Sequence, residues 1–410
     1  MSSVEVFIRV HREEDVRQLA LQGKHYPEID MQFALNQIAG WQTARKKIPS
    51  WAAREGIIYP PHLSMEQCSS EQTARYKARI LRGCEVQGTK YVDLTGGLGV
   101  DFSFLANTFE EAVYVERDER LCMLARQNFE VLGLRGAEVV NSDGVDYLRQ
   151  MNPVDMIFLD PARRDQYGGR TIAISDCSPD ILGIERELLE KATWVMVKLS
   201  PMLDWHKVVD DLNGVGDVVR EVHIVSVGNE CKELLIVMSS KSNTPLTVWC
   251  VNDNSTFVFS KSEEYRGYYD SMNEERRTRN ENQQSLLTPQ NYLYEPNSSV
   301  MKAGCFNVLE KHYNVMPVAK NSHLLISADF IENFPGRKMQ ILAISSASKN
   351  VAKLLPDAKG KANITVRNFP MTAEQLRKKL KLKDGGDTYI FGTTTDDHKH
   401  IVIICRKAKE

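Results

Sequence analysis

The sequence predicts an α/β protein built on a Rossmann-like sheet of seven strands, the last of them antiparallel. Short apolar segments alternate with helical segments over residues 86–240, a pattern typical of a parallel sheet covered on both faces. A glycine-rich turn, Thr95-Gly-Gly-Leu-Gly99, follows the first strand and opens a helix. Only Gly228-Asn-Glu230 separates the last two strands, which is too short for a crossover helix, so these strands are expected to form a hairpin.

Each element follows from its own pattern. Strands are expected where apolar and β-branched residues run for four to eight positions, and helices where apolar residues recur every three or four positions. The expected strands are residues 91–94, 112–117, 137–142, 155–160, 193–200, 220–227 and 231–238. The expected helices between them are residues 98–108, 118–132, 144–150, 178–191 and 203–212.

Further regions flank this predicted sheet domain of residues 86–240. Residues 1–85 have helical periodicity, and Ser69-Ser-Glu-Gln72 predicts a capping box in which Ser69 is the N-cap. Residues 241–290 contain a hairpin signal, with strand-like runs at 246–251 and 256–260, and then a strongly polar linker. Residues 291–410 are expected to form a small α+β domain.

Composition limits the class of protein. A net charge of −2 provides no global field for a polyanion, so any nucleic-acid surface must be local. The charged first fifteen residues exclude a secretory signal, and no apolar run approaches the ~20 residues that a membrane span needs. The eight cysteines are scattered without a metal-binding spacing. We therefore expect a cytoplasmic protein with neither a metal site nor a membrane partner.

Acidic residues follow the predicted strands at the edge where open α/β sheets bind ligands. Asp93 and Glu116 end the first two strands, and Asp143 follows the third. The dinucleotide fingerprint GxGxxG is absent, which makes a nicotinamide cofactor the weaker interpretation. The spacing from Asp93 to Gly99 instead resembles motif I of class I S-adenosylmethionine (SAM) methyltransferases, with Thr95 in place of the first glycine.

That resemblance implies a role for each residue in binding SAM. The turn glycines would let the backbone approach the methionine part, and Asp93 would accept from its amino group. Glu116 would bind the ribose hydroxyls. Asp143 would accept from the adenine amine, or would simply cap the helix that begins at Gly144. The candidate cofactor residues are Asp93, Thr95, Gly96, Gly97, Gly99, Glu116, Asp143 and Asp160.

Asp160-Pro-Ala-Arg-Arg164 follows the fourth strand, where enzymes that methylate exocyclic amines usually have Asp/Asn-Pro-Pro-Tyr/Phe. Arg163 replaces the aromatic residue, and arginine can stack on a base or bind a phosphate. Asp160, Pro161 and Arg163 are therefore candidate catalytic residues, and Arg163 and Arg164 are candidate substrate contacts. Cys177 fits a core thiol better than a nucleophile.

A second constellation resembles the Lys-Asp-Lys-Glu tetrad of the heat-shock family of ribose 2′-O-methyltransferases. Lys77, Asp160, Lys198 and Glu233 lie on the corresponding elements. A lysine among acids can hold and deprotonate a hydroxyl if its pKa is tuned. Alternatively, Lys198 only forms a salt bridge at a strand end and Lys77 is a surface residue.

The chain as a whole resembles a bacterial family of class I methyltransferases with a C-terminal THUMP-like domain. The resemblance covers nearly the whole chain and implies SAM dependence and an RNA substrate. It rests on Lys47-Ile-Pro-Ser-Trp51, Glu66-Gln-Cys-Ser-Ser-Glu71, Asp93-Leu-Thr-Gly-Gly97, Asp160-Pro-Ala-Arg-Arg164 and Thr365-Val-Arg-Asn-Phe-Pro370.

The C-terminal fifty residues carry eleven Lys or Arg and six Asp or Glu, a net charge of +5. A basic cluster on the helix expected after Pro370 is either a phosphate-binding surface or a solvated helix face. Its candidate substrate contacts are Arg377, Lys378 and Lys379, with Lys381, Lys383 and Arg367 nearby.

These features predict an enzyme, a SAM-dependent methyltransferase acting on RNA. Two alternatives stay open: a methyltransferase for a small molecule or protein, and a non-catalytic nucleic-acid-binding protein with a relic methyltransferase fold.

Overall fold

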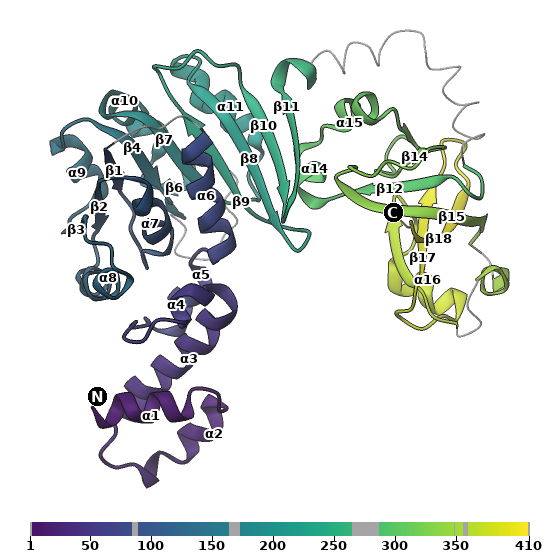
Figure 1. Ribbon diagram of the computed structural model, residues 1–410. Coiled ribbons are helices and arrows are strands. Elements are labelled where there is room, and N and C mark those ends of the chain that lie inside the picture. Colours follow the sequence, from purple (N-terminus) through teal and green to yellow (C-terminus); the bar gives the residue numbers. More distant parts are fainter. Residues whose placement is uncertain are drawn as a thin grey trace. The chain divides into compact units, whose positions relative to one another are not determined.

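The computed structural model describes residues 2–83, 89–163, 173–264, 287–347, 349–355 and 360–408 (Figure 1). The chain divides into two compact units, Met1–Val222 with Glu233–Thr244, and His223–Lys232 with Pro245–Glu410. The division therefore falls within the hairpin formed by the last two strands of the predicted sheet.

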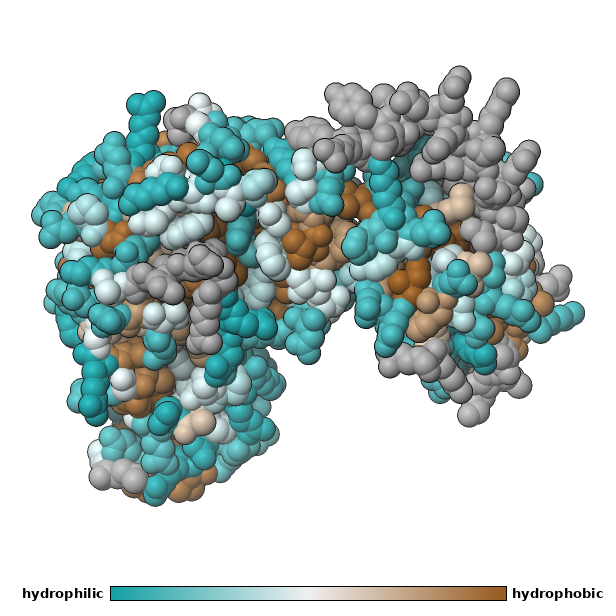
Figure 2. All heavy atoms as spheres, turned by 45° about the horizontal axis from the view of Figure 1, so that its top comes forward, coloured by the Kyte–Doolittle hydropathy of each residue, from teal (hydrophilic) through white to brown (hydrophobic). Residues whose placement is uncertain are grey.

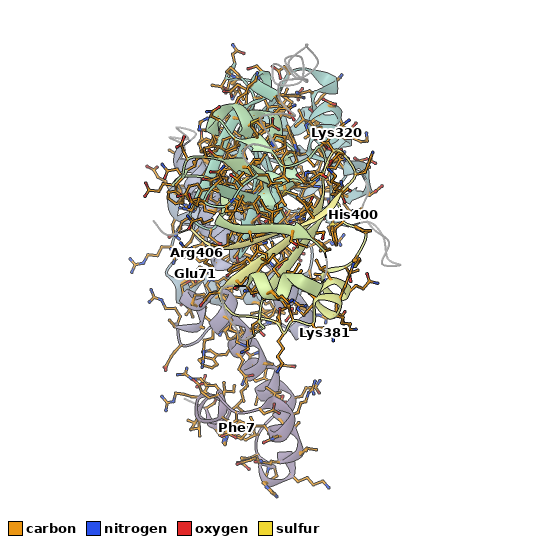
Figure 3. All side chains as sticks on the ribbon, turned by 90° about the vertical axis from the view of Figure 1, so that its right-hand side faces the viewer. Phe7, Glu71, Lys320, Lys381, His400 and Arg406 are labelled. Carbon is orange, nitrogen blue, oxygen red and sulfur yellow. The ribbon has the colours of Figure 1, made fainter. Side chains whose placement is uncertain are left out.

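Helices form the N-terminal region, as expected. They are α1 (Ser3–His11), α2 (Val16–Leu21), α3 (Met31–Lys47), α4 (Pro49–Ala52), α5 (His62–Gln67) and α6 (Glu71–Gly83). Phe7, which is labelled in Figure 3, packs with Leu19 and with Ile38 of α3 in a small apolar core.

The N-cap of α6 is Ser70, so the prediction of Ser69 was wrong by one residue. The Oγ of Ser70 accepts a hydrogen bond from the backbone N–H of Thr73 at 3.2 Å. The hydroxyl of Ser69 instead donates to a carboxylate oxygen of Asp101 at 2.6 Å. Ser69 is thereby available to the site described below.

The predicted sheet is confirmed, with each of its seven strands within one residue of the expected bounds. The strand order is β11-β10-β8-β9-β7-β4-β1-β2-β3, and β10 and β11 extend the predicted seven. The strands are β1 (Lys90–Asp93), β2 (Glu111–Glu116), β3 (Ala137–Asn141), β4 (Val154–Leu159), β7 (Ala192–Leu199), β8 (Val219–Val227), β9 (Glu230–Met238), β10 (Thr247–Asn252) and β11 (Ser255–Ser260).

The directions of the strands bring the predicted site residues to one edge. β1 pairs in parallel with β2 and β4, β2 with β3, and β4 with β7, whereas β9 pairs antiparallel with β7. The carboxyl ends of five strands therefore lie together. The helices that follow them are α7 (Val100–Leu105), α8 (Glu119–Leu132), α9 (Gly144–Gln150), α10 (Ile181–Lys191) and α11 (Trp205–Leu212).

Packing explains two glycines of the turn after β1. A Cβ atom on Gly96 would lie 2.2 Å from the ring of Tyr114, and one on Gly99 would lie 2.8 Å from the ring of Phe129. Gly99 also has a φ of +80°, which disfavours other residues. Side chains from β2 and α8 thus require glycine here, independently of any ligand.

The second unit contains the predicted hairpin, because β10 and β11 pair antiparallel around Asp253, which has a positive φ. It also holds a seven-stranded sheet in the order β13-β14-β12-β15-β18-β17-β16. Most of the predicted polar linker, residues 265–286, lies outside the described residues. The elements are β12 (Tyr292–Pro296), α14 (Ser298–Ala303), α15 (Phe306–Tyr313), β13 (Met316–Pro317), β14 (Leu325–Ser327), β15 (Gly336–Ser346), β16 (Asn363–Arg367), α16 (Ala373–Leu380), β17 (Thr388–Thr394) and β18 (His400–Lys407).

On the face shown in Figure 2, hydrophobic side chains form separate small areas among hydrophilic ones. Within the described ranges, no helix combines the length and the apolar composition that crossing a membrane requires.

Candidate active site

A cavity of about 640 Å³ opens at the carboxyl edge of the first unit's strands. This volume lies within the range of ~300–1,000 Å³ typical of small-molecule sites. The cavity is lined by the turn after β1 and by the starts of α7, α9 and α10. All eight candidate cofactor residues line it: Asp93, Thr95, Gly96, Gly97, Gly99, Glu116, Asp143 and Asp160.

Asp93 gives the cavity an acidic floor. Its carboxyl group is 1% exposed, and Oδ1 accepts from the backbone N–H of Thr95 at 2.9 Å. Burial raises the pKa of Asp93 well above its usual value; the Thr95 N–H opposes this rise, and Asp101, Asp160 and Glu116 add to it. Because these acids repel one another, the cavity would stabilise a cationic ligand.

Thr95 stands where the resembled motif usually has a glycine, and the structure gives its hydroxyl a hydrogen-bond partner. Its Oγ1 accepts from the backbone N–H of Asp160 at 2.6 Å. Glycine has no such acceptor. Thr95 therefore fixes the end of β4 relative to the turn after β1.

Glu116 retains acceptor capacity for a ligand. Its Oε2 accepts from the backbone N–H of Gly97 at 2.9 Å, and its Oε1 accepts from that of Asp118 at 2.8 Å. Each carboxylate oxygen can accept a second hydrogen bond. Both oxygens are thus held in place with one lone-pair site left on each.

Asp143 has the capping role that one of the two interpretations proposed. It is the N-cap of α9, since Oδ1 accepts from the backbone N–H groups of Val145 at 2.8 Å and Asp146 at 3.3 Å. Its Oδ2 makes no hydrogen bond to any described residue, and Asp143 lines the cavity. Capping therefore orients the carboxylate and leaves one oxygen for a ligand.

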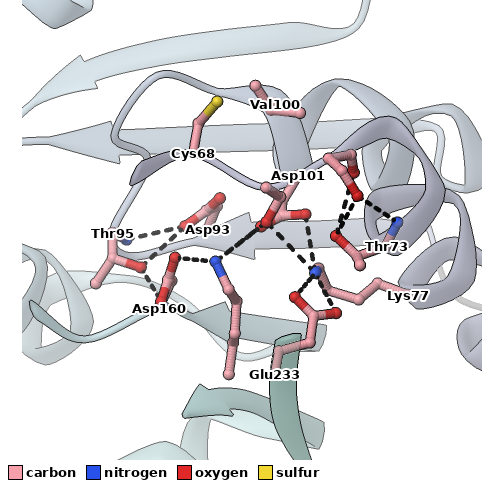
Figure 4. A network of polar contacts seen from close by, with 12 residues as sticks. Cys68, Thr73, Lys77, Asp93, Thr95, Val100, Asp101, Asp160 and Glu233 are labelled. Carbon is pink, nitrogen blue, oxygen red and sulfur yellow. Dashed lines mark hydrogen bonds and ion pairs between the residues drawn. The ribbon is translucent and has the colours of Figure 1, made fainter. Parts of the chain in front are cut away.

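A buried ion-pair network lies beside the cavity (Figure 4). Lys77 of α6 is 0% exposed, so it is not the surface residue that one alternative proposed. Its Nζ lies 2.6 Å from Oε2 and 2.7 Å from Oε1 of Glu233 on β9. The same Nζ lies 3.2 Å from Oδ1 of Asp101 on α7.

Lys198 of β7 extends the network to the cavity. Its Nζ lies 2.5 Å from Oδ2 of Asp160, 3.1 Å from Oγ of Ser69 and 3.7 Å from Oδ2 of Asp101. Lys77, Asp160, Lys198 and Glu233, the four residues of the predicted tetrad, are thus brought together. Asp101 and Ser69 join its two halves.

Charge balance keeps Lys198 cationic. Burial by itself would lower the pKa of Lys198, but Asp160, Asp101 and Glu233 outweigh burial and raise it. Burial would raise the pKa of Asp101, yet Lys77 and Lys198 hold it below its usual value. Burial raises the pKa of Glu233, with Lys77 and Lys198 opposing the rise. Asp160 has the most accessible carboxylate of the network, with a side chain 41% exposed.

Sequence reasoning missed Asp101 and Ser69 because each had a simpler explanation. An acid in the first turn of a helix is favoured by the helix dipole, and a serine before a helix is a common N-cap. Cys68 and Arg117 also line the cavity without having been predicted.

Of the predicted arginines of the Asp160 motif, the structure describes only the backbone of Arg163. The backbone of Arg163 lies in β5 (Ala162–Arg163), which pairs with β6 (Cys177–Ser178). The Arg163 side chain and all of Arg164 lie outside the described residues. Cys177 is buried, with an exposure of 4%, as expected for a core thiol.

The predicted RNA contacts lie in the second unit, and several are paired with acids. Arg367 lies 2.9 Å from Glu295, Arg377 forms an ion pair with Asp384, and Lys378 lies 3.2 Å from Glu374. Lys379, Lys381 and Lys383 are exposed at or just beyond the end of α16. Of these, Lys381 is labelled in Figure 3.

The strand order and the acid-lined edge define the class of this protein: its first unit has a class I methyltransferase fold. Family models match residues 336–407 as THUMP domain-like and residues 292–335 as a ferredoxin-like domain. A crystal structure of a "putative methyltransferase" from Porphyromonas gingivalis W83 is 31% identical, covers 99% of this chain and 98% of its own, and aligns with a TM-score of 0.82. This chain belongs to the same family, the class I methyltransferases with a C-terminal THUMP-like domain.

Other solved structures match part of the chain at lower similarity. A SAM-dependent methyltransferase from Agrobacterium tumefaciens is 19% identical over 42% of this chain and 63% of its own, with a TM-score of 0.31. An rRNA methylase from Streptococcus thermophilus is 14% identical over 40% of this chain and 93% of its own, with a TM-score of 0.30. No curated protein matches the chain.

Proposed function

We propose that this protein is a SAM-dependent methyltransferase that methylates a hydroxyl group of RNA, the ribose 2′-hydroxyl. One observation carries the choice of acceptor: the Lys198 ammonium lies 2.5 Å from the accessible Asp160 carboxylate, at the edge of the acidic cavity.

The chemistry of the cavity fits SAM. SAM carries a sulfonium and an ammonium group, and the mutual repulsion of Asp93 and its neighbouring acids favours positive charge there. Glu116 keeps a free lone-pair site on each oxygen for the ribose hydroxyls, and the Oδ2 of Asp143 can accept from the adenine amine. Bound SAM would supply an electrophilic methyl group. Apolar side chains that line the same cavity are Leu98, Leu121, Val145 and Ile184.

The sign of the charge on Lys198 favours an oxygen nucleophile. A hydroxyl that loses its proton develops negative charge on oxygen, which a fixed ammonium stabilises. An amine that accepts a methyl group develops positive charge, which the same ammonium would oppose. Because Asp160, Asp101 and Glu233 raise the pKa of Lys198, the ammonium persists at neutral pH.

Asp160 and Lys198 then divide the work on the acceptor. The Oδ2 of Asp160 is occupied by Lys198, whereas Oδ1 makes no hydrogen bond to a described residue and can accept the hydroxyl proton. Lys198 holds Asp160 in place and donates to the developing alkoxide. It acts as a cation and not as the general base, since its raised pKa leaves no neutral amine.

A base amine is the second candidate, because Asp160-Pro161 matches the first half of the amine-methylating motif. The aromatic residue that stacks on the base in such enzymes is absent from this motif. The Lys198 ammonium would also oppose the positive charge that develops on an amine during methylation. Support for RNA over a small molecule or a protein comes from the THUMP-like domain and from the net charge of +5 over residues 361–410.

Nucleoside analysis separates these functions. Total RNA from a deletion strain is incubated with purified protein and SAM carrying a deuterated methyl group, then digested and analysed by mass spectrometry. The proposal expects a 2′-O-methylnucleoside with a deuterated methyl group in the incubated RNA. The same nucleoside without the label should be present in RNA of the parental strain and missing from untreated RNA of the deletion strain. A label on a base selects the amine mechanism. Labelled small molecules or proteins without labelled RNA contradict the RNA assignment, and failure to bind the product S-adenosylhomocysteine indicates a relic fold.

A further inference from the structure

The second unit contains a polar cavity of about 640 Å³ that no role assigned so far explains. It is lined by the β8–β9 turn, the β10–β11 turn, the end of β12 and the start of β15, all within that unit. Asn229, Asn252, Asn254, Asn297 and Asn333 contribute to the lining together with Glu295, Glu332, Arg337 and Lys338.

Asn297 carries an unused hydrogen-bond donor. It is 5% exposed and caps α14, with Oδ1 accepting from the backbone N–H of Val300 at 3.1 Å and from Oγ of Ser299 at 2.7 Å. Because the backbone N–H requires an acceptor, the orientation of the amide is fixed. Its buried Nδ2 has no partner among the described residues. Buried donors are normally satisfied, so this group indicates a missing acceptor.

Asn229 repeats the pattern in the neighbouring turn. Its Oδ1 accepts from the backbone N–H of Ser298 at 2.8 Å, which again fixes the amide. Its Nδ2 makes no hydrogen bond to any described residue. In both Asn229 and Asn297, the side-chain oxygen accepts a hydrogen bond from the protein, whereas the side-chain N–H groups make none to the described residues.

Glu295 pairs with two arginines, of which Arg337 lines the cavity and Arg367 does not. The carboxylate is 3% exposed, with Oε2 accepting from Nε of Arg337 at 2.5 Å and Oε1 accepting from Nη2 of Arg367 at 2.9 Å. Arg337 also donates from Nη2 to Oγ1 of Thr365 at 3.2 Å. Its Nη1 makes no hydrogen bond within the described part of the chain, and its side chain is 40% exposed.

The cluster of Glu295, Arg337 and Arg367 carries a net positive charge, since its two guanidinium groups share one buried carboxylate. Glu332 is the other lining acid, and it is exposed, so solvent screens its charge. The groups left unused at Asn229, Asn297 and Arg337 are all donors. An acceptor-rich anion is the ligand that satisfies such a set.

We propose that this cavity binds a phosphate group, carried either by an RNA chain or by a free nucleotide. Arginine held by a buried carboxylate offers a preoriented N–H group to phosphate oxygens. The RNA source rests on the proposed function, in which RNA is the substrate. The cavity would then contact the RNA backbone at a place separate from the basic cluster on α16.

Binding is measured by fluorescence anisotropy with the full chain and a labelled single-stranded oligoribonucleotide, and by competition with AMP, inorganic phosphate and adenosine. Asn229→Asp replaces a donor by a charged acceptor at an exposed position. Asn297→Ser removes the unused N–H group and keeps a good N-cap. Asn36→Asp, at an exposed site of α3, makes the same charge change as Asn229→Asp in the first unit. Thermal unfolding verifies that each variant is folded.

The expected result is a loss of about tenfold or more in affinity for the Asn229→Asp/Asn297→Ser double variant, the scale of losing hydrogen bonds to a charged group. Asn36→Asp should bind like the wild type, and adenosine should not compete. Competition by AMP identifies a free nucleotide, whereas binding of the oligoribonucleotide alone identifies RNA. Unchanged affinity in the folded double variant, or no binding of any phosphate probe by the wild type, would overturn the proposal.

The fate of the proposed function is read separately, from binding of S-adenosylhomocysteine. If the wild type binds this product and the double variant keeps its RNA affinity, the cavity assignment is wrong and the methyltransferase assignment stands. If the wild type does not bind S-adenosylhomocysteine while the double variant loses its affinity for the phosphate probe, the methyltransferase assignment is wrong and the cavity assignment stands.

Discussion

At the scale of single residues, Lys198 supplies the positive charge next to Asp160. We expect Lys198→Met to lower kcat by about 10²–10³, the cost of losing one preorganised group that stabilises developing negative charge. Affinity for S-adenosylhomocysteine should stay within about twofold, because Lys198 does not line the cavity proposed to bind the cofactor. Single-turnover kinetics and calorimetry measure the two quantities.

Lys207→Met provides the matched control, since Lys207 forms an exposed ion pair with Asp211 at 2.9 Å on α11. It should leave both quantities unchanged. Lys198→Arg keeps the charge and should recover part of the rate. If folded Lys198→Met turns over normally, the ammonium has no part in the reaction and the choice of a hydroxyl acceptor fails.

Asp143 permits a second test at this scale, because one oxygen caps α9 and the other is open to the cavity. Asp143→Asn keeps the cap and replaces the open acceptor by a donor. We expect weaker binding of S-adenosylhomocysteine by roughly 1–2 kcal/mol, with little change in stability. Calorimetry and thermal unfolding check the two parts.

Asp118→Asn is the matched control for Asp143→Asn. Asp118 caps α8 through Oδ1, which accepts from the backbone N–H of Arg120 at 2.8 Å, and it does not line the cavity. Equal losses in the two variants would mean that the loss of a negative charge at a helix N-terminus, and not contact with the ligand, explains the effect of Asp143.

At the scale of elements, α10 contains a buried acid with an unusual pKa. Glu185 is 2% exposed, and its Oε1 has no hydrogen-bond partner among the described residues. Burial raises the pKa of Glu185 to about 7 from 4.5. As the pH rises from about 4.5 to about 7, the unfolded chain releases this proton first, so the free energy of unfolding falls through that window.

Glu185→Gln stays neutral and should remove this loss. The variant should be more stable than the wild type at pH 8 by on the order of 1–3 kcal/mol, and the difference should shrink towards pH 4.5. Urea unfolding at several pH values gives the difference between the two proteins. Glu190→Gln, on an exposed position of the same helix, should show no such dependence. If the difference in the free energy of unfolding between Glu185→Gln and the wild type does not change with pH, the raised pKa of Glu185 is contradicted.

The elements themselves show what sequence can predict. Strands such as β4 and β7 were predicted within one residue because buried parallel strands have continuous apolar runs. The start of α10 was predicted three residues early, because Cys177 and Ser178 pair with β5 instead. This pairing is made by backbone groups, so the periodicity of apolar side chains gives no sign of it.

The site divides in the same way. The acids at strand ends follow from topology, so the sequence alone could place Asp93, Glu116 and Asp160 at one edge of the sheet. The contact of Asp101 with both lysines depends on how α6 packs against α7, which only tertiary structure shows. The unused donors of Asn229 and Asn297 could not be predicted either, because their oxygens accept from residues whose position depends on the tertiary fold or on the local cap geometry.

At the scale of the whole molecule, cofactor binding and RNA binding are assigned to different units and should be separable. Lys379, Lys381 and Lys383 are exposed basic residues at or just beyond the end of α16, and no ion pair is formed by them within the described residues. If they contact phosphates of single-stranded RNA, each contact contributes about −0.7 to the slope of log affinity against log salt concentration. The triple variant with glutamine at these positions should therefore bind RNA more weakly and with a slope flatter by up to about 2.

Affinity for S-adenosylhomocysteine should not change in that variant, since the cavity proposed to bind the cofactor is lined only by residues between Gln67 and Ile184. Glutamine at Lys24, Lys46 and Lys207, three exposed lysines of the first unit, removes the same charge and controls for a general electrostatic effect. Anisotropy titrations at several salt concentrations measure the slopes. If both triple variants flatten the slope equally, the basic cluster on α16 is a solvated helix face, and the cavity lined by Asn229, Asn297 and Arg337 is then the remaining candidate for phosphate recognition by the second unit.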